Sequence, residues 1–408
     1  MATLSDLDLK RVELNSAIDD YKQAVVDFAA ATITQQDLDA AKELAILTGD
    51  EYAVLIAQVK KDDPVVTNDD QLFSNPGRMN ALVRDDIATI LSTGSFFGSG
   101  LKLLVDTEGN ASGVTNVILS FAEGSDVTID WGDASARQTY TGAASHTYVD
   151  PGQYEVQIIG TVNGFTRPLS ESRQQLKDVM QWGVVEFANI EKMFQQRTGF
   201  VISASDGPIL LPGASCYQMF NNASDFNSNI NHWDMSNVVN MDAMFLGAKA
   251  FNQPLNDWDV SNVVDMASMF NTASAFNQSL NNWDVSNVVD MSRMFYYTSL
   301  FNQPLNSWNV SSVTTMSFMF RVAAAFNQPL NAWNVSSVTS MNDMFNQADA
   351  FNRPLNSWNV SSVTSMAYMF ANADSFNQNL NAWDVSQVTS FPGFNADSAL
   401  SGSNLPNF

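Results

Sequence analysis

Apolar residues return every 25 positions through the second half of the chain. A Met-Phe pair ends at each of Phe220, Phe245, Phe270, Phe295, Phe320, Phe345 and Phe370. A Trp follows the same period at Trp233, Trp258, Trp283, Trp308, Trp333, Trp358 and Trp383. A fixed period of this length is typical of stacked units that bury their apolar faces against one another. We therefore predict a seven-unit solenoid over residues 219–394, with a short strand at Val260–Met266 and a helical turn at Met269–Ala275 in one unit.

Both ends of the array depart from the period, as terminal units must when they shield an open core. Residues 167–218 are predicted to form an N-terminal cap with one degenerate repeat, because Trp182, Met193, Phe194 and Phe200 keep the internal spacing of a unit. At the other end Phe391-Pro-Gly-Phe394 replaces the expected Met and Met-Phe residues. Residues 395–408 then form a C-terminal tail.

Polar residues share the period. We interpret the columns of Asn, and the Asp-or-Asn column after each Trp, as residues that satisfy turn backbone groups or bond to the neighbouring coil. The Trp column is assigned to the core. A carbohydrate site built from Asn, Asp and Trp is the alternative for these residues. The columns begin at Asn252, Asn256 and Asp259 in one representative unit.

The first 61 residues follow a helical period instead. Steps of three and four alternate through Leu4, Leu7, Arg11, Leu14, Ile18, Tyr21, Val25 and Phe28. This heptad seam predicts a helical arm over residues 1–61 that anchors or oligomerises the chain. We expect a homo-oligomer, with a trimer favoured, and the alternative is an intramolecular helical hairpin. Residues 62–100 are predicted to be a linker with a short helix.

Alternating and apolar runs separated by Gly, Asp and Pro predict strands at 114–121, 127–131 and 154–158. The motif Asp130-Trp-Gly-Asp133, His146-Thr-Tyr148 and Pro151-Gly-Gln-Tyr154 resembles PKD-type immunoglobulin-like domains. The resemblance implies a β-sandwich over residues 101–166, with the Trp and the second Tyr in its core and a spacer role. Asp130 and Asp133 are a candidate calcium pair, although two carboxylates are few for that ion, and no other cofactor is expected. His146 is expected to be a packed residue.

The repeats resemble those of BspA-like leucine-rich-repeat surface proteins. The residues that carry the resemblance are Met244-Phe245, Phe251-Asn252, Leu255, Trp258-Asp-Val-Ser-Asn-Val263 and Met266. The resemblance implies a leucine-rich-repeat-like solenoid and a role in adhesion, with no catalytic residues to carry over. The complete prediction is a multidomain fold with an N-terminal α-helical arm, a PKD-like β-sandwich and a C-terminal leucine-rich-repeat-like solenoid.

The composition narrows the range of partners. The formal net charge is −24, with only 19 Lys and Arg residues, so a basic surface for nucleic acid is not expected. No apolar run reaches the 18 residues typical of a membrane span, and we expect no membrane insertion. The start shows no basic and apolar leader, which favours assembly in the cytoplasm. The one cysteine, Cys216, occupies a Met position of the repeat and is predicted to be buried.

Catalysis is not expected. The two histidines, His146 and His232, lie far apart in sequence, and no phosphate loop, metal-ligand spacing or nucleophile–base pair is present. Candidate ligand contacts are instead sought at outward positions that vary between units. They are Arg293, Tyr296 and Tyr297, which interrupt the pattern, and Asn262, Asp265 and Asp290, which begin an acidic strip that becomes rich in Ser and Thr. A merely soluble sheet face is the alternative for the strip.

Three functions fit these patterns. The first is a virion-surface fibre or appendage, most plausibly of a bacteriophage, whose arm binds other virion proteins and whose repeats meet a glycan or protein on the host surface. The second is a bacterial cell-surface adhesin. The third is an intracellular protein-binding scaffold.

Overall fold

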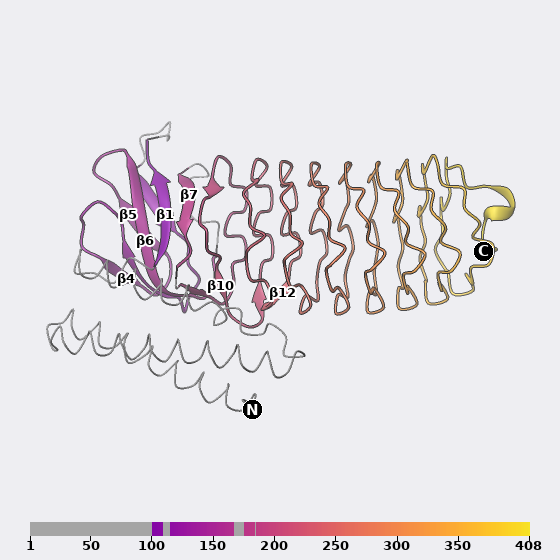
Figure 1. Cartoon of the computed structure of the whole chain (residues 1–408), viewed down its shortest axis with the longest axis horizontal. Coiled ribbons are helices and arrows are strands. Elements are labelled where there is room, and N and C mark those ends of the chain that lie inside the picture. The colour runs from indigo at the N-terminus through magenta and orange to yellow at the C-terminus, as the bar shows by residue number, and fades with distance from the viewer. Residues whose placement is uncertain (1–99, 109–114, 167–174, 184) are drawn as a thin grey trace, which may run out of the picture. The chain divides into compact units, whose positions relative to one another are not determined.

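The computed structural model describes residues 100–108, 115–166, 175–183 and 185–408. The chain divides into two compact units, Met1–Ser99 and Gly100–Phe408. The predicted helical arm, linker and short helix of residues 1–99 therefore lie outside the described residues. The second unit begins with a β-domain and continues into the repeats (Figure 1).

Twelve strands are present in the described residues, most of them in or beside the β-domain. They are β1 (Leu101–Asp106), β2 (Asn116–Leu119), β3 (Asp126–Asp130), β4 (Gln138–Tyr140), β5 (Ala144–Thr147), β6 (Gln153–Val162), β7 (Leu176–Gln181), β8 (Glu186–Phe187), β9 (Val201–Ile202), β10 (Ile209–Leu210), β11 (Ala214–Ser215) and β12 (Val238–Asn240). Strands β2, β3 and β6 lie where the alternating pattern predicts strands.

The main sheet runs from the β-domain into the segment that precedes the repeats. Its order is β10-β8-β6-β1-β7-β9, and β3 joins β6 while β4 joins β3. Strand β1 pairs antiparallel with both β6 and β7, whereas β8 runs parallel to β6. A second sheet contains β2 and β5, and a third contains β11 and β12. The β-domain and the first coils thus share one backbone hydrogen-bond network.

Trp131 and Tyr148 lie at the centre of the β-domain and are both buried. The Tyr148 hydroxyl donates to the Trp131 carbonyl oxygen at 2.9 Å. Burial raises the pKa of Tyr148 well above its usual range, because the phenolate would lose its hydration. The Tyr154 ring stacks on Tyr148 with its centroid 3.8 Å away. Trp131 is therefore in the core as the motif predicts, whereas Tyr154, the second Tyr of the motif, is only partly buried against it.

Residues 214–394, here called the repeat stack, are built from overlapping turns. In one coil the N–H groups of Met291, Arg293, Phe295 and Tyr297 donate to carbonyl oxygens 24 positions later, such as Thr315 for Met291. The N–H groups between them, such as that of Met294, donate three positions back within the same coil. Every N–H from 291 to 298 except that of residue 292 is bonded in this way, and the Ser292 N–H donates to Asp290 Oδ1. Every backbone N–H group of this segment therefore has a hydrogen-bond acceptor within the protein.

Aromatic columns fill the interior. Successive Phe rings of the Met-Phe column stack with centroids 5.4–5.7 Å apart. The Trp rings are nearly buried, and from Trp258 on each indole N–H donates to a carbonyl 28 positions earlier, as Trp308 does to Leu280 at 2.9 Å. Burial of Trp with its N–H paired gives the large apolar contribution without an unsatisfied donor. The assignment of the Trp column to the core is confirmed.

Asparagine side chains link successive coils. Asn302 Oδ1 accepts the Asn327 N–H at 2.9 Å, and the same bond recurs from Asn227 to Asn377. The Asp-or-Asn residue after each Trp closes its own turn instead, as Asp259 Oδ1 does by accepting the Ser261 N–H at 3.0 Å. The structural role of the first Asn column is confirmed.

The predicted fold class is wrong. Regular structure in the described residues is nearly all β, in several sheets, and includes no α-helix, only the short 3-10 helix η2 (Gly402–Asn404). A leucine-rich-repeat-like solenoid needs a strand in each unit, and a helix was expected opposite it. The predicted strand Val260–Met266 retains bridges only at Asp265, to Asn240 and to Asp290, because Asp259 turns the chain at Ser261. The predicted helix Met269–Ala275 is a series of turns, because the neighbouring Ser268 and Thr272 within it have positive φ.

Candidate binding surface

The most variable side chains of the repeat stack project from the turns around each Met-Phe pair. Two residues per coil have left-handed backbone there, for example Arg293 (φ 57°) and Tyr297 (φ 57°). The same two positions are left-handed in the next coil, where they are Phe318 and Val322. The buried Met and Phe residues between them are nearly constant. This surface can therefore vary in chemistry while the interior stays the same.

The structure brings three predicted contact residues together on this surface. The Arg293 guanidinium lies over the Phe318 ring at 4.6 Å, and the Tyr296 ring meets Phe318 edge-on at 6.4 Å. Tyr296 and Tyr297 pack edge to face at 4.6 Å. Arg321 lies 5.8 Å from the Tyr296 ring. We call Arg293, Tyr296, Tyr297, Phe318 and Arg321 the aromatic–arginine cluster.

An ion pair between the half-buried Arg321 and the buried Asp343 fixes one side of the cluster. Arg321 Nη1 lies 3.0 Å from Asp343 Oδ1, and Asp343 is 8% exposed. Asn346 Nδ2 donates to the same carboxylate oxygen at 2.7 Å. Removal of Asp343 would leave the half-buried guanidinium of Arg321 without this carboxylate partner. The pair therefore limits the motion of Arg321 and supports the rings beside it.

Exposure within the cluster is uneven. Tyr297 is 42% exposed and Arg293 is exposed, whereas Tyr296, Phe318 and Arg321 are half-buried. An exposed Tyr and Arg above half-buried rings present large contact area with few free torsions. The arrangement is suited to contact with another molecule.

Sequence reasoning missed Phe318 and Arg321. Each lies 25 positions after a predicted residue, Phe318 after Arg293 and Arg321 after Tyr296. Both replace small or polar residues of other coils, such as Ser268 and Asn271. Comparison of each variable column with the next coil would have found them.

The other predicted contacts lie on a different strip. Asp265 and Asp290 are bridge partners in successive coils, and each carboxylate accepts a backbone N–H two residues on, at 2.9 and 2.7 Å. The Asn262 amide donates to the Ser236 carbonyl oxygen at 2.8 Å and so links two coils. The side-chain donor of Asn262 is already used within the protein.

Asp242 joins this acidic strip. Burial, together with the charges of Asp265 and Asp290, raises the pKa of Asp242 to about 6. Burial and the charge of Asp290 likewise raise the pKa of Asp265, against the lowering effect of the Ala267 N–H. Within the described residues, no group of three or more His, Cys, Asp or Glu side chains has the geometry of a metal site. The strip is therefore a region of charge repulsion.

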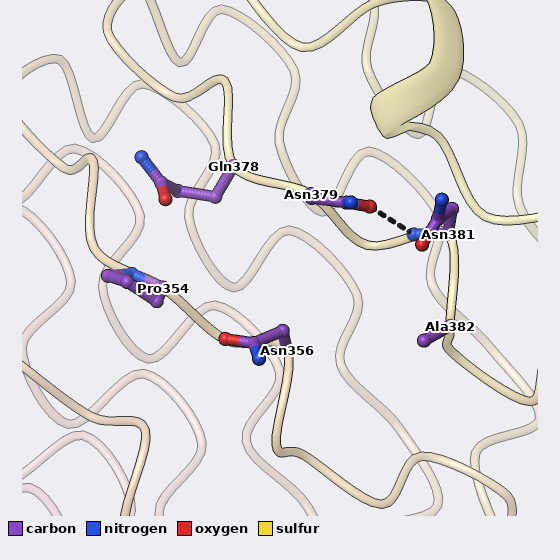
Figure 2. A pocket seen from close by; sticks show the side chains of 6 residues that line it. All are labelled: Pro354, Asn356, Gln378, Asn379, Asn381 and Ala382. Atoms are coloured by element: carbon purple, nitrogen blue, oxygen red, sulfur yellow. Dashed lines mark hydrogen bonds between the residues drawn. The ribbon is translucent and has the colours of Figure 1, made fainter.

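A small cavity lies between the last two coils. Its volume is about 310 Å³, and Pro354, Asn356, Gln378, Asn379, Asn381 and Ala382 line it. Figure 2 shows four amide side chains around this space, with the Asn379 side chain directed towards Asn381. Asn379 Oδ1 accepts the Asn381 N–H at 3.0 Å. We call this the amide groove, and no residue of it was among the predicted contacts.

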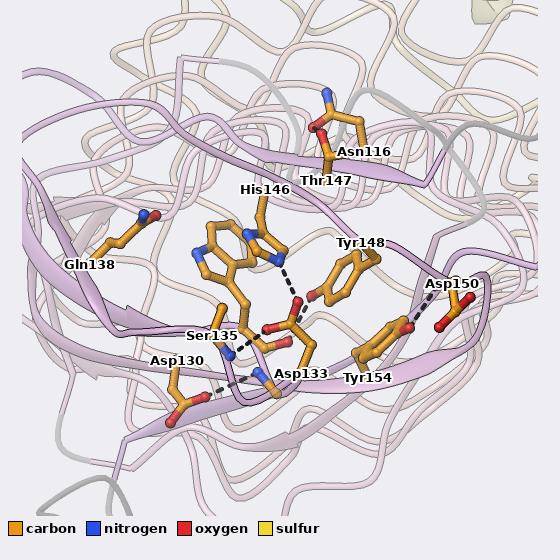
Figure 3. Close-up of polar contacts among 12 residues, drawn as sticks. Asn116, Asp130, Asp133, Ser135, Gln138, His146, Thr147, Tyr148, Asp150 and Tyr154 are labelled. Carbon is orange, nitrogen blue, oxygen red and sulfur yellow. Dashed lines mark hydrogen bonds and ion pairs between the residues drawn. The ribbon is translucent and has the colours of Figure 1, made fainter.

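The candidate calcium pair of the β-domain is used in internal contacts. Asp133 Oδ2 lies 2.7 Å from His146 Nε2 (Figure 3), and Asp130 Oδ2 lies 3.1 Å from Arg137 Nε. Burial raises the pKa of Asp133, but hydrogen bonds from Ser135 and His146 outweigh it and lower the pKa to about 2. The His146 ring also stacks on Trp131 at 5.1 Å. His146 is thus a packed residue, as predicted.

Cys216 is completely buried, and burial raises the pKa of its thiol far above the usual range. A buried neutral thiol is a weak nucleophile. Among the residues that the structure describes, no helix has the length and apolar character needed to span a membrane.

The repeat stack is similar to one known family. Residues 214–328 and 304–407 match the model of the family described as Mycoplasma protein of unknown function, DUF285. Comparisons with curated proteins and with solved structures gave no significant match. From residue 214 to residue 407, this chain is therefore similar in sequence to the Mycoplasma family DUF285.

Proposed function

We propose that this chain is a non-enzymatic adhesion protein whose aromatic–arginine cluster contacts a glycan or protein on a cell surface. The observation that carries the proposal is the cluster itself. Arg293 is exposed above Phe318 and Tyr297 is exposed beside Tyr296, and Tyr and Arg are residue types that dominate binding energy at interfaces. Nothing in the packing of the repeat stack requires these side chains, because other coils have Ser268 and Thr272 at the same positions.

The proposal places the protein on a virion surface, where the N-terminal arm binds other virion proteins and joins identical chains. A bacterial cell-surface location is the second candidate, and the similarity of the repeats to a Mycoplasma family favours it. The repeat residues quoted above support kinship with BspA-like surface proteins. The buried Trp131 and Tyr148 support kinship of the β-domain with PKD-type spacer domains.

Binding to intact cells tests the adhesion role. Labelled full-length chain is expected to bind host cells saturably, and Phe318→Ser is expected to weaken that binding about tenfold or more, because Arg293 and Tyr296 lose the ring that positions them. Val264→Thr serves as the control. Val264 is exposed on a different strip, and Thr is the residue at the equivalent position 314, two coils later. Equal binding by Phe318→Ser and the unmodified chain would remove the cluster from the proposal.

Location is tested separately by mass spectrometry of purified virions and by surface labelling of intact bacteria. Full-length chain in virions supports the fibre. Labelling of the bacterial surface, with the chain absent from virions, supports the cell-surface adhesin instead and contradicts the fibre.

A further inference from the structure

One asparagine column of the repeat stack is not used in the same way in every coil. Asn331 Oδ1 accepts the N–H of Ser357 at 3.1 Å, and its carbonyl oxygen accepts the Ser357 hydroxyl. The Asn281 side chain likewise accepts the Ser307 hydroxyl at 2.8 Å. The serine hydroxyl of the following coil therefore donates to the backbone oxygen of Asn331, and to both the backbone and the side-chain oxygen of Asn281.

The last pair of coils lacks this serine. Ala382 lies 25 positions after Ser357, and the side chain of Asn356 makes no hydrogen bond to any residue in the described part of the chain. Asn379 stands where Pro354 stands in the preceding coil. Ala382 lacks the hydroxyl that could bond to Asn356, and Asn379 adds an amide side chain. Both residues line the same cavity.

The amide groove that results has a defined chemistry. Its six lining residues include four amides, one proline and one alanine, and none of them carries a charge. Its volume of about 310 Å³ is at the small end of the range for ligand pockets. The Asn356 amide offers a donor and an acceptor side by side, and Asn379 offers its Nδ2 donor while its Oδ1 already accepts the Asn381 N–H. Such groups match adjacent hydroxyl groups. Pro354 and Ala382 offer an apolar surface to C–H groups.

We propose that the amide groove binds one or two units of a neutral carbohydrate, with Asn356 and Asn379 as the principal hydrogen-bonding residues. A neutral ligand fits better than an anionic one, because the groove has no cation and the chain has a net charge of −24. A peptide is less suited, because the groove is too small for an extended segment and has no apolar side-chain pocket. Gln378 keeps its amide nitrogen on Asn352 Oδ1 at 2.7 Å and forms a fixed wall.

This site goes beyond the proposed function, since it uses none of the residues of the aromatic–arginine cluster. A chain can lose one site and keep the other. Variants of Phe318 or Tyr297 are therefore expected to leave saccharide binding unchanged, and failure of one proposal can be told from failure of the other.

Two substitutions test the groove in the full-length chain. Ala382→Ser introduces the hydroxyl that, at Ser307, donates to Asn281 Oδ1, and Asn379→Pro introduces the residue of four other coils. Ala332→Ser is the matched control, because it faces Asn306 beside Pro329, where the second amide is lacking. All three introduce residues that the stack already tolerates, and thermal unfolding verifies that they fold.

Isothermal titration calorimetry is performed with neutral hexose and N-acetylhexosamine mono-, di- and trisaccharides, and with their sialylated counterparts. At least one neutral saccharide is expected to bind with millimolar or better affinity. Ala382→Ser and Asn379→Pro are each expected to weaken it about tenfold, with no change for Ala332→Ser. Absence of binding by every neutral saccharide, stronger binding of the sialylated forms, or unchanged affinity in Ala382→Ser would overturn the proposal.

Discussion

Two positions in each coil have left-handed backbone whatever side chain they carry, and Val322 has the least suitable one. Its φ is 59°, while Asn372, at the same position two coils later, has φ 53°. A β-branched side chain in this region is strained by about 1–2 kcal/mol, whereas Asn tolerates it. The native chain therefore keeps variable side chains at a cost in stability.

Val322→Asn is expected to raise the free energy of unfolding by about 1 kcal/mol, because it relieves that strain. Denaturant titration of the full-length chain measures the change. Val264→Asn, at an exposed position without positive φ, is the control and is expected to have little effect. A loss of stability in Val322→Asn would show that packing of the valine outweighs its backbone strain.

Asp242 makes the stability depend on pH. Burial and the charges of Asp265 and Asp290 raise its folded pKa to about 6, above the ordinary value of 3.8. The folded state therefore binds the proton of Asp242 more tightly than the unfolded state does. The stability that this tighter binding contributes is complete below pH 3.8 and is lost as the pH rises through 6. Asp242→Asn is expected to stabilise the chain at pH 7, on the order of 1 kcal/mol.

The same substitution is expected to reduce the difference in melting temperature between pH 4.5 and pH 7. Melting curves across this range measure it, with Asp384→Asn as a control at an exposed aspartate. An unchanged pH dependence in Asp242→Asn would contradict the assignment of charge repulsion to this strip.

Within each coil, the Asn column of Asn302 contributes more to the free energy of unfolding than the Asn column of Asn306, four positions later. Asn302 Oδ1 accepts both the Asn327 N–H and the Gln328 amide, at 2.9 Å each. Asn302→Ala would leave a backbone donor without its partner and is expected to cost about 1–3 kcal/mol. Asn306→Ala is the matched control, since the Asn306 side chain bonds to none of the described residues.

Chemical denaturation of both variants measures the difference. If Asn306→Ala destabilised the chain as much as Asn302→Ala, the hydrogen bonds from Asn302 Oδ1 to the next coil would not be the source of the effect.

The columns of a coil could be predicted from the sequence, but its local structure could not. The Trp and Asn columns repeat without change, and their roles follow from burial and backbone satisfaction. The period alone does not say where each N–H donates. Phe318 and Val322 give no sign of left-handed backbone, because neither is Gly or Asn, so a strand and a helix were predicted where turns occur.

At the scale of the whole molecule, the main sheet was the least predictable feature. Strand β7 pairs with β1 although more than 70 residues separate them, and short strands such as β8 have too few residues to show a period. The binding surface was predictable in part. Arg293, Tyr296 and Tyr297 interrupt the pattern within one coil, whereas the amide groove depends on Ala382 and its neighbour coil together.

The structure separates two sets of residues in the described unit. Constant apolar and Asn residues hold successive coils together, and variable residues on left-handed backbone form the candidate binding surface. We therefore expect that residues of the second set can be exchanged while the first set still holds the coils together.

The affinity of one triple variant for host cells tests this claim most directly. Arg293→Ser, Tyr296→Asn and Tyr297→Thr together introduce the residues of the preceding coil, whose backbone has the same left-handed positions. We expect at least a tenfold loss of binding, with the melting temperature unchanged within a few degrees. Full binding by a folded triple variant would contradict it.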